Sequence, residues 1–314
     1  MKYGFGADVG GTTVKMGFFT HMGDLVEKWE IPTVTKNNGE QILPDIAQTI
    51  DDCLARHGVD KADVLGIGIG VPGPVSDAGV VNRCVNLGWG VFDLHETLSG
   101  LTGLPVKAGN DANVAALGEY WKGGGAGCRS MVLATLGTGI GGGIIIDGKI
   151  LSGAHGVGGE IGHIVYNKEE TERCGCGKFG CAEQYASATG VVRVAKRLLI
   201  KSNEPSSLRT LDPITCRGVF EEAAKGDKIS QEALEYVYDC LGQFLADVCC
   251  VCDPELVVIG GGVSKAGQVL LDGIQKYFPR YMFHACKDTK FALAQLGNDA
   301  GIYGSFRLVL DHLA

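Results

Sequence analysis

The sequence lacks the features of a membrane protein or a nucleic-acid-binding protein. No apolar run reaches the roughly 18 residues that a membrane-spanning helix needs. Positive charge is not in excess: 28 Lys and Arg stand against 36 Asp and Glu, a net charge of -8, so bulk electrostatics favours neither nucleic acids nor membranes as partners. Only 9 of the 314 residues are proline, which argues against a low-complexity or collagen-like chain. What remains is a folded protein long enough for two domains with full cores.

Two recognisable segments are also missing from the start of the chain. Met1-Lys-Tyr-Gly-Phe-Gly has no apolar region of a secretory signal peptide, and no helix-turn-helix module precedes the first predicted strand. We therefore expect a cytoplasmic protein whose 12 cysteines are reduced core residues or metal ligands rather than disulfides. Those outside a metal-binding pattern are interpreted as structural or core residues: Cys53, Cys84, Cys128, Cys216, Cys240, Cys249, Cys250, Cys252 and Cys286.

The periodicity of the chain predicts an α/β fold. Apolar runs and alternation predict strands over residues 3–8, 13–19, 25–31, 64–71, 106–110, 131–136, 144–146 and 256–259. Helical spacing predicts helices over residues 39–57, near 190–201 and over 229–252, and one more opening at Asp111. Alternating strands and helices indicate a largely parallel sheet beyond the opening hairpins. The strand, glycine turn and strand at 3–19 recur at 131–146, which predicts two similar halves.

Glycine is abundant, with 49 residues against a usual share of roughly 7%, and it gathers in turns after apolar runs. In Asp8-Val-Gly-Gly-Thr-Thr-Val-Lys15, Gly10 and Gly11 let backbone N–H groups approach phosphate oxygens. Thr12 adds a hydroxyl, and Asp8 can hold Mg²⁺ directly or through water. An ordinary hairpin turn is the alternative for this segment alone. The segment is not a Walker loop, because the Gly-Lys-Ser/Thr ending is absent.

Two further glycine turns strengthen the phosphate-binding interpretation. Leu136-Gly-Thr-Gly-Ile-Gly-Gly-Gly143 follows a predicted strand and offers Gly137, Thr138 and Gly139 to phosphates. Gly260, Gly261 and Gly262 follow another strand, where a bare backbone can lie flat against a nucleoside or simply make a tight connection. Two strand–turn–strand units in one chain are a stronger signal than either alone.

Asn110 and Asp111 lie at the end of a predicted strand and open a helix. An asparagine there can hydrogen-bond two neighbouring sugar hydroxyls. Asp111 is placed where a general base would accept a hydroxyl proton, and it is equally well placed to cap the helix. Position alone leaves both roles for Asp111 open.

His163 is followed by Cys174-Gly-Cys176-Gly-Lys-Phe-Gly-Cys181, a compact set of one imidazole and three thiols. Four N or S ligands with short spacings are typical of a tetrahedral zinc site whose positions are all filled by protein. A reduced thiol cluster without metal is the alternative. Glu160 and Glu183 flank the cluster, and we expect the metal to brace His163 and these carboxylates around a polyhydroxylated ligand.

These motifs together resemble the ROK family of sugar kinases, within the actin-like/hexokinase ATPase superfamily. The resemblance covers nearly the whole chain, and Cys181-Ala-Glu183-Gln-Tyr-Ala-Ser-Ala-Thr-Gly190 is similar to bacterial ROK glucokinases in particular. It implies a two-domain, ribonuclease H-like α/β fold with a cleft between the domains. The smaller domain would comprise residues 1–119 plus 299–314, with a C-terminal helix over 299–313 packing on it. The larger domain, 120–298, would carry the zinc site and nucleotide loops.

The resemblance also implies roles for individual residues. Asp111 would be the catalytic base that activates the sugar's 6-hydroxyl. The sugar would be bound by Gly73, Asn86, Asn110, Asp111, Glu160, His163 and Glu183. The nucleotide would be bound by Asp8, Gly10, Gly11, Thr12, Lys15, Gly137, Thr138, Gly139, Gly260, Gly261 and Gly262. Structural Zn²⁺ would be held by His163, Cys174, Cys176 and Cys181, Mg²⁺ would accompany ATP, and the chains would form homodimers or homotetramers. No role is carried over to Tyr166.

We therefore predict ATP-dependent phosphorylation of a hexose at its 6-hydroxyl, with glucose as the sugar. A kinase for N-acetylglucosamine, N-acetylmannosamine, fructose or allose is the main alternative. Glucose and its 2-acetamido analogue differ at one pocket wall, and the sequence does not show the volume of that wall. A sugar-responsive repressor of the same family would need a DNA-binding module before the first strand. A non-catalytic zinc-stabilised scaffold is disfavoured by the intact Asp111 and phosphate turns.

Overall fold

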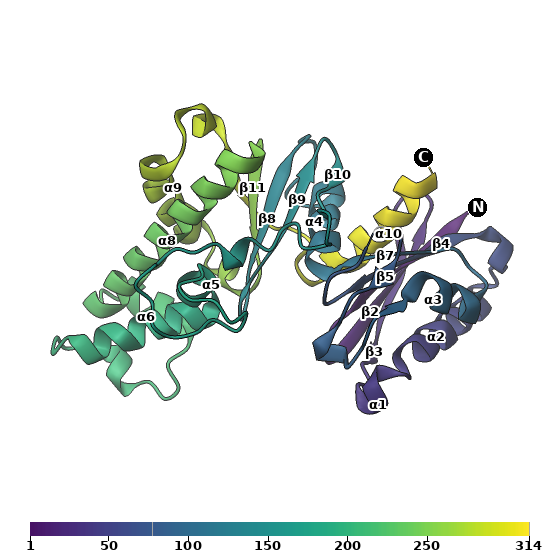
Figure 1. Ribbon diagram of the computed structural model, residues 1–314, viewed down its shortest axis with the longest axis horizontal. Helices are drawn as coiled ribbons and strands as arrows, with labels where there is room; N and C mark the ends of the chain where they lie inside the picture. The colour runs from purple at the N-terminus through teal and green to yellow at the C-terminus, as the bar shows by residue number, and fades with distance from the viewer. Residues whose placement is uncertain (77, 314) are drawn as a thin grey trace. The chain divides into compact units, whose positions relative to one another are not determined.

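The chain forms two compact units, described in a computed structural model over residues 1–76 and 78–313 (Figure 1). The first unit comprises Met1–Gly127, Gly143–Gly159 and Gln295–Ala314, and the second comprises Cys128–Gly142 and Glu160–Ala294. The structure has two five-stranded sheets, and helices pack on each of them.

The first sheet has the strand order β3-β2-β1-β4-β7. Its strands are β1 (Tyr3–Val9), β2 (Thr13–Thr20), β3 (Leu25–Pro32), β4 (Val64–Val71) and β7 (Val106–Asn110). The first three are antiparallel neighbours, whereas β4 runs parallel to both β1 and β7. This confirms the predicted opening hairpins followed by parallel strands.

Helices of the first unit bury apolar stripes against this sheet. They are α1 (Lys36–Gly39), α2 (Ile42–His57), α3 (Leu94–Thr102), α4 (Asp111–Lys122) and α10 (Ala300–Leu313), with the short elements η1 (Lys61–Asp63), β5 (Val80–Val81), η2 (Val85–Leu87), β6 (Phe92–Asp93) and η7 (Gly297–Asp299). The predicted helix over 39–57 is confirmed as α2, which ends at Gly58 in the left-handed conformation. The C-terminal helix α10 packs against α4, β1 and β4, as expected.

The second sheet has the order β10-β9-β8-β11-β12. Its strands are β8 (Met131–Leu136), β9 (Ile140–Ile146), β10 (Lys149–Ile150), β11 (Leu256–Gly260) and β12 (Lys290–Leu293). Strand for strand, this order repeats that of the first sheet, so the predicted internal duplication is confirmed. The boundary between the units falls within β9.

The second glycine turn is shorter than the sequence predicts. A turn over 137–143 was expected, but β9 already begins at Ile140, so only residues 137–139 turn. Gly143 is extended rather than turning, and a Cβ there would lie 2.4 Å from the Cβ of Ala116 in α4. Gly143 therefore serves the close packing of a strand on a helix, which a count of glycines does not distinguish from a loop.

Long helices cover the sheet of the second unit. The predicted helices are confirmed as α6 (Ala188–Lys201) and α8 (Lys228–Cys252), and α8 ends where Asp253 adopts the left-handed conformation before Pro254. The others are α5 (Glu183–Ala186), α7 (Cys216–Ala224) and α9 (Gln268–Tyr281), with the 3₁₀ turns η3 (Ile161–His163), η4 (Ser207–Thr210), η5 (Gly262–Ala266) and η6 (His284–Asp288). In Figure 1, α8 lies beside α9, against which it packs. Over residues 1–76 and 78–313, no helix combines the length and apolarity needed to cross a bilayer.

Candidate functional site

Four metal-binding side chains converge in the second unit. One ligand atom from each of His163, Cys174, Cys176 and Cys181 lies within 4.8 Å of the other three. The Sγ atoms of Cys176 and Cys181 are 3.6 Å apart, and Cys174 Sγ lies 3.8 Å from His163 Nδ1. Two thiolates bound tetrahedrally at about 2.3 Å from zinc lie about 3.8 Å from one another. The spacing and the donor set therefore fit one tetrahedral zinc ion.

A tight loop brings these ligands together. Arg173 and Phe179 form an antiparallel bridge, and the N–H of Cys174 donates to the carbonyl of Lys178 at 2.8 Å, so residues 174–178 turn back sharply. A second bridge pairs Val165 with Cys181, which carries the segment after His163 past the last cysteine. The ligands are close in sequence and the loop needs few long-range contacts to place them, which is why the pattern could be read from the chain.

The protein environment shifts the pKa values of the three thiols apart. Desolvation raises the pKa of Cys174, and the hydrogen bond to the Glu183 carboxylate raises it further. Desolvation likewise raises the pKa of Cys181. At exposed Cys176, desolvation is outweighed by the backbone N–H of Lys178 and the neighbouring thiols, so its pKa is lowered.

Glu183 joins the cysteine cluster to the second glycine turn. Its Oε1 lies 3.7 Å from His163 Nδ1 and accepts a hydrogen bond from Cys174 Sγ at 3.0 Å. Its Oε2 accepts the N–H of Ile140 at 3.2 Å. A Cβ at Gly139 would lie 2.3 Å from that same oxygen, so only glycine lets the turn approach the carboxylate so closely. Glu160 reaches the other ring nitrogen of His163, at 3.8 Å from Nε2.

The second glycine turn also meets the beginning of α6. The carbonyl of Gly137 accepts the N–H of Ala188 at 2.8 Å, and the hydroxyl of Thr189 donates to the carbonyl of Thr138 at 2.7 Å. Thr138 itself is exposed. The turn is thus held at a helix N-terminus, which favours anions such as phosphate.

Asn110 and Asp111 lie at the carboxyl end of β7 in the first unit. Asn110 caps α4: its Oδ1 accepts the N–H groups of Ala112 and Asn113 at 3.0 and 3.1 Å, and its Nδ2 donates to the carbonyl of Gly73 at 3.2 Å. The capping role that the sequence left open for Asp111 therefore belongs to Asn110. Asp111 is the first helical residue, and its Oδ1 accepts the N–H of Ala112 at 2.8 Å. The arrangement holds Gly73 beside this strand end, while Asn86 is exposed in η2.

The first glycine turn carries charge. Asp8 is mostly buried, and desolvation raises the pKa of its carboxyl although Lys15, with Nζ 3.9 Å from Oδ2, lowers it in part. Lys15 also donates to the carbonyl of Asn298 at 3.3 Å. Gly11 and Thr12 are exposed, and the N–H of Gly10 closes the turn by donating to Thr13. A desolvated carboxylate beside an exposed turn is a suitable ligand for a hard cation that a phosphate also binds.

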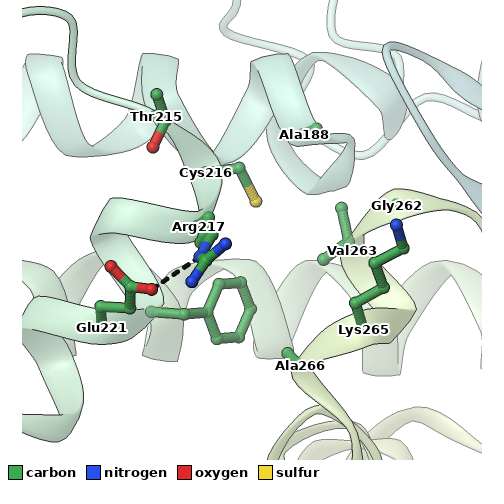
Figure 2. Close-up of a pocket in the computed structure, with 10 residues that line it drawn as sticks. Ala188, Thr215, Cys216, Arg217, Glu221, Gly262, Val263, Lys265 and Ala266 are labelled. Carbon is green, nitrogen blue, oxygen red and sulfur yellow. Dashed lines mark hydrogen bonds and ion pairs between the residues drawn. The ribbon is translucent and has the colours of Figure 1, made fainter.

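A cavity of about 650 Å³ adjoins the third glycine turn in the second unit. Figure 2 shows Cys216, Arg217 and Glu221 on one side and the segment from Gly262 to Ala266 on the other. The Nε of Arg217 donates to Glu221 at 2.6 Å, and burial raises the pKa of Cys216 to about 11. The residues that line this cavity are Ala188, Thr215, Cys216, Arg217, Phe220, Glu221, Gly262, Val263, Lys265 and Ala266. The volume suits a nucleoside-sized ligand.

A smaller cavity, about 340 Å³, lies between the second glycine turn and the cysteine loop. Thr138, Gly139, Arg173, Cys174 and Glu183 line it together with Gln184, Thr189, Gly190 and Arg193. Within the second unit the structure thus brings the cysteine cluster, Glu183 and the second turn to one place. The α7 wall of the larger cavity was missed by sequence reasoning, because its residues belong to an ordinary amphipathic helix.

Comparison with known proteins places these features in a family. The model of the ROK family matches residues 4–312. A glucokinase of Halalkalibacterium halodurans is 44% identical over 309 residues, which covers 97% of this chain and 94% of that protein. The crystal structure of a ROK hexokinase from Thermus thermophilus superposes with a TM-score of 0.83 at 30% identity, covering 99% of both chains. A ROK family glucokinase from Streptomyces griseus, solved with glucose and AMPPNP, gives a TM-score of 0.75 at 34% identity, covering 98% of both chains.

The family match spans residues 4–312, a range that contains the sheets, the glycine turns and the cysteine loop described above. The predicted actin-like, hexokinase-type fold is confirmed by the solved ROK hexokinase. The chain belongs to the ROK family.

Proposed function

We propose that the protein is an ATP:hexose 6-phosphotransferase and that its sugar is glucose. The observation that carries this proposal is the 44% identity to a glucokinase over nearly the whole chain. In this protein Asp111, the carboxylate expected to act as base, directly follows β7 and is the first residue of α4. The cavity beside Gly262 has the size of a nucleoside site.

Asp111 accepts the proton of the sugar's 6-hydroxyl. As the proton leaves, the hydroxyl oxygen bonds to the γ-phosphorus of ATP, and the bond from that phosphorus to the bridging oxygen breaks to release ADP. A loose phosphoryl-transfer transition state needs the nucleophile to be oriented more than it needs a strong base. Asp111 meets that need at the start of α4, where Asn110 caps the helix and the Oδ1 of Asp111 accepts the N–H of Ala112.

By the family resemblance we assign the sugar's remaining hydroxyls to Gly73, Asn86, Asn110, Glu160, His163 and Glu183. Zinc held by His163, Cys174, Cys176 and Cys181 would fix the imidazole. With four protein ligands it would have no open position from which to activate water, so its role would be structural.

Phosphates are assigned to the turns of residues 10–12 and 137–139, with the start of α6 behind the second turn. Mg²⁺ carried with ATP would be held through Asp8 and would neutralise charge on the phosphates. Lys15 stands beside Asp8 and moderates its charge. Of the three glycines expected to contact the nucleoside, Gly262 lines the cavity, and Thr215 and Phe220 belong to its facing wall. Gly260 is buried at the end of β11, and Gly261 joins it to Gly262.

The proposal extends to the setting of the enzyme. Thiolate ligands suit the reducing cytoplasm, where the cysteines of the cluster would stay reduced. Assembly into dimers or tetramers is proposed from the family resemblance, and light scattering of the purified protein measures it.

A coupled assay with a panel of hexoses tests the function. Glucose, N-acetylglucosamine, N-acetylmannosamine, fructose and allose are compared by kcat/KM with Mg-ATP as donor. Glucose is expected to give the highest value. If an acetamido sugar exceeds glucose, the sugar assignment is wrong while the kinase assignment stands, and if no hexose is phosphorylated the kinase assignment fails.

A further inference from the structure

A second group of metal-type ligands lies in the first unit, on the face of β3 that meets α2. The alternate residues Leu25, Glu27, Trp29 and Ile31 form the half-buried face of this strand. Glu27 thus places a carboxylate in a row that is otherwise apolar. A charge in such a position needs partners that satisfy it.

The partners come from the last turn of α2. Cys53 and His57 are four residues apart, so their side chains share one face of the helix, directly below the buried Ile46 and Ile50. Cys53 is fully buried within the apolar core of the unit. His57 is partly exposed and packs its ring against Phe18 at 5.3 Å.

The three side chains present one ligand atom each within 4.8 Å of one another. Glu27 Oε2 lies 2.6 Å from His57 Nε2 and 3.8 Å from Cys53 Sγ. Arg56 engages the other carboxylate oxygen, with Nη2 2.8 Å from Oε1. One oxygen of Glu27 is therefore anchored by Arg56, while the other faces the imidazole and the thiol.

We propose that Glu27, Cys53 and His57 form a binding site for a divalent metal of zinc type. Sulfur, imidazole and carboxylate together select a borderline cation over Mg²⁺ or Ca²⁺, which prefer oxygen alone. Three protein ligands leave one position of a tetrahedral zinc for solvent, and the partial exposure of His57 and Glu27 admits it. Binding releases the thiol proton of Cys53 to solvent. The ion would clamp the end of α2 to β3, apart from the residues assigned to catalysis.

The test counts metal on the full-length protein. Protein whose cysteine-loop site is filled is titrated in two separate experiments, one with Zn²⁺ and one with Co²⁺. The absorption of bound Co²⁺ reports thiolate ligation. A second equivalent is expected, and Cys53→Ala and His57→Gln should each weaken its binding at least about tenfold. Cys84→Ala and His21→Gln are matched controls, a buried cysteine and an exposed histidine of the same unit outside the cluster, and should leave binding unchanged.

Two outcomes would overturn the site. If His57→Gln lowers the melting temperature equally with and without Zn²⁺ and no second equivalent binds to the parent protein, the three residues form an ion pair and a core thiol only. If folded Cys176→Ala loses both equivalents, the second ion belonged to the cysteine loop. Neither outcome depends on whether the protein phosphorylates a sugar, so this proposal and the kinase proposal fail separately.

Discussion

The two sheets have the same strand order but different chemistry at equivalent positions. Asp8 in β1 lies opposite Gly70 of the parallel strand β4, and Thr135 in β8 lies opposite Gly260 of the parallel strand β11. The first sheet thus carries a carboxylate where the second carries a hydroxyl. The turn after Asp8 has a lysine partner, whereas the turn after Thr135 is uncharged and held at the start of α6.

This difference indicates how a duplicated scaffold divides its work. A carboxylate at the end of a strand suits a cation or a proton, and a neutral turn at a helix N-terminus suits an anion. The first unit also supplies Asp111, and the second supplies the cysteine cluster. Three substitutions test whether the division holds.

The largest effect is expected at Asp111. Asp111→Asn keeps the shape of the side chain but removes the proton acceptor, so kcat should fall by about 10² to 10⁴. Sugar affinity should stay within about tenfold, because an amide still hydrogen-bonds a hydroxyl. Steady-state kinetics and a sugar-binding titration measure the two quantities.

Asp52→Asn, at an exposed position of α2, is the control. Near-normal turnover in Asp111→Asn would show that Asp111 is not the catalytic base.

The next effect is expected in the second unit, at the cysteine loop. Cys176→Ala removes one of four ligands, so the bound zinc should drop from about one per chain to a small fraction of that, and the melting temperature should fall. Elemental analysis and calorimetry measure both. Cys250→Ala, at another exposed cysteine, should change neither. An iron cluster, or a parent protein without metal, contradicts the zinc assignment.

The smallest effect is expected at Asp8, where one substitution compares the two sheets directly through the melting temperature. Asp8→Thr gives the first sheet the residue of the second. Burial raises the pKa of Asp8 above 3.8, so the folded protein binds its proton more tightly than the unfolded chain does. Stability from this group is therefore lost as the pH rises through the window above 3.8. Without Mg²⁺, Asp8→Thr should melt at a slightly higher temperature than the parent protein at neutral pH, and this difference should vanish in acid. A lower melting temperature than the parent at neutral pH would contradict this and would mean that Lys15 stabilises the carboxylate fully.

Much of the architecture could be predicted because its signals are local. The alternation in 13–19 and 25–31 fixed two strands, and the repeated strand, glycine turn and strand indicated the duplication. The cysteine cluster was predictable for the same reason, since Cys174, Cys176 and Cys181 share one short loop.

What sequence reasoning missed depends on contacts between distant segments. The wall of the nucleoside-sized cavity comes from α7, whose side chains meet Gly262 only through the packing of helices on the second sheet. Asn110 and Asp111 are both good capping residues. Because β7 ends at Asn110 and α4 begins at Asp111, the capping role belongs to Asn110. Cys53 was interpreted as an ordinary core thiol, because Glu27 lies on another element.

The two carboxylate oxygens of Glu183 contact two different parts of the site, so binding at one part would affect binding at the other. One contacts the cysteine–histidine cluster and the other holds the strand that leaves the second glycine turn. A change in the metal's occupancy therefore acts on the carboxylate that also positions the turn assigned to phosphate. If zinc and nucleotide bind as proposed, they are linked ligands: whatever factor the metal contributes to the affinity for ATP, ATP must return to the affinity for the metal.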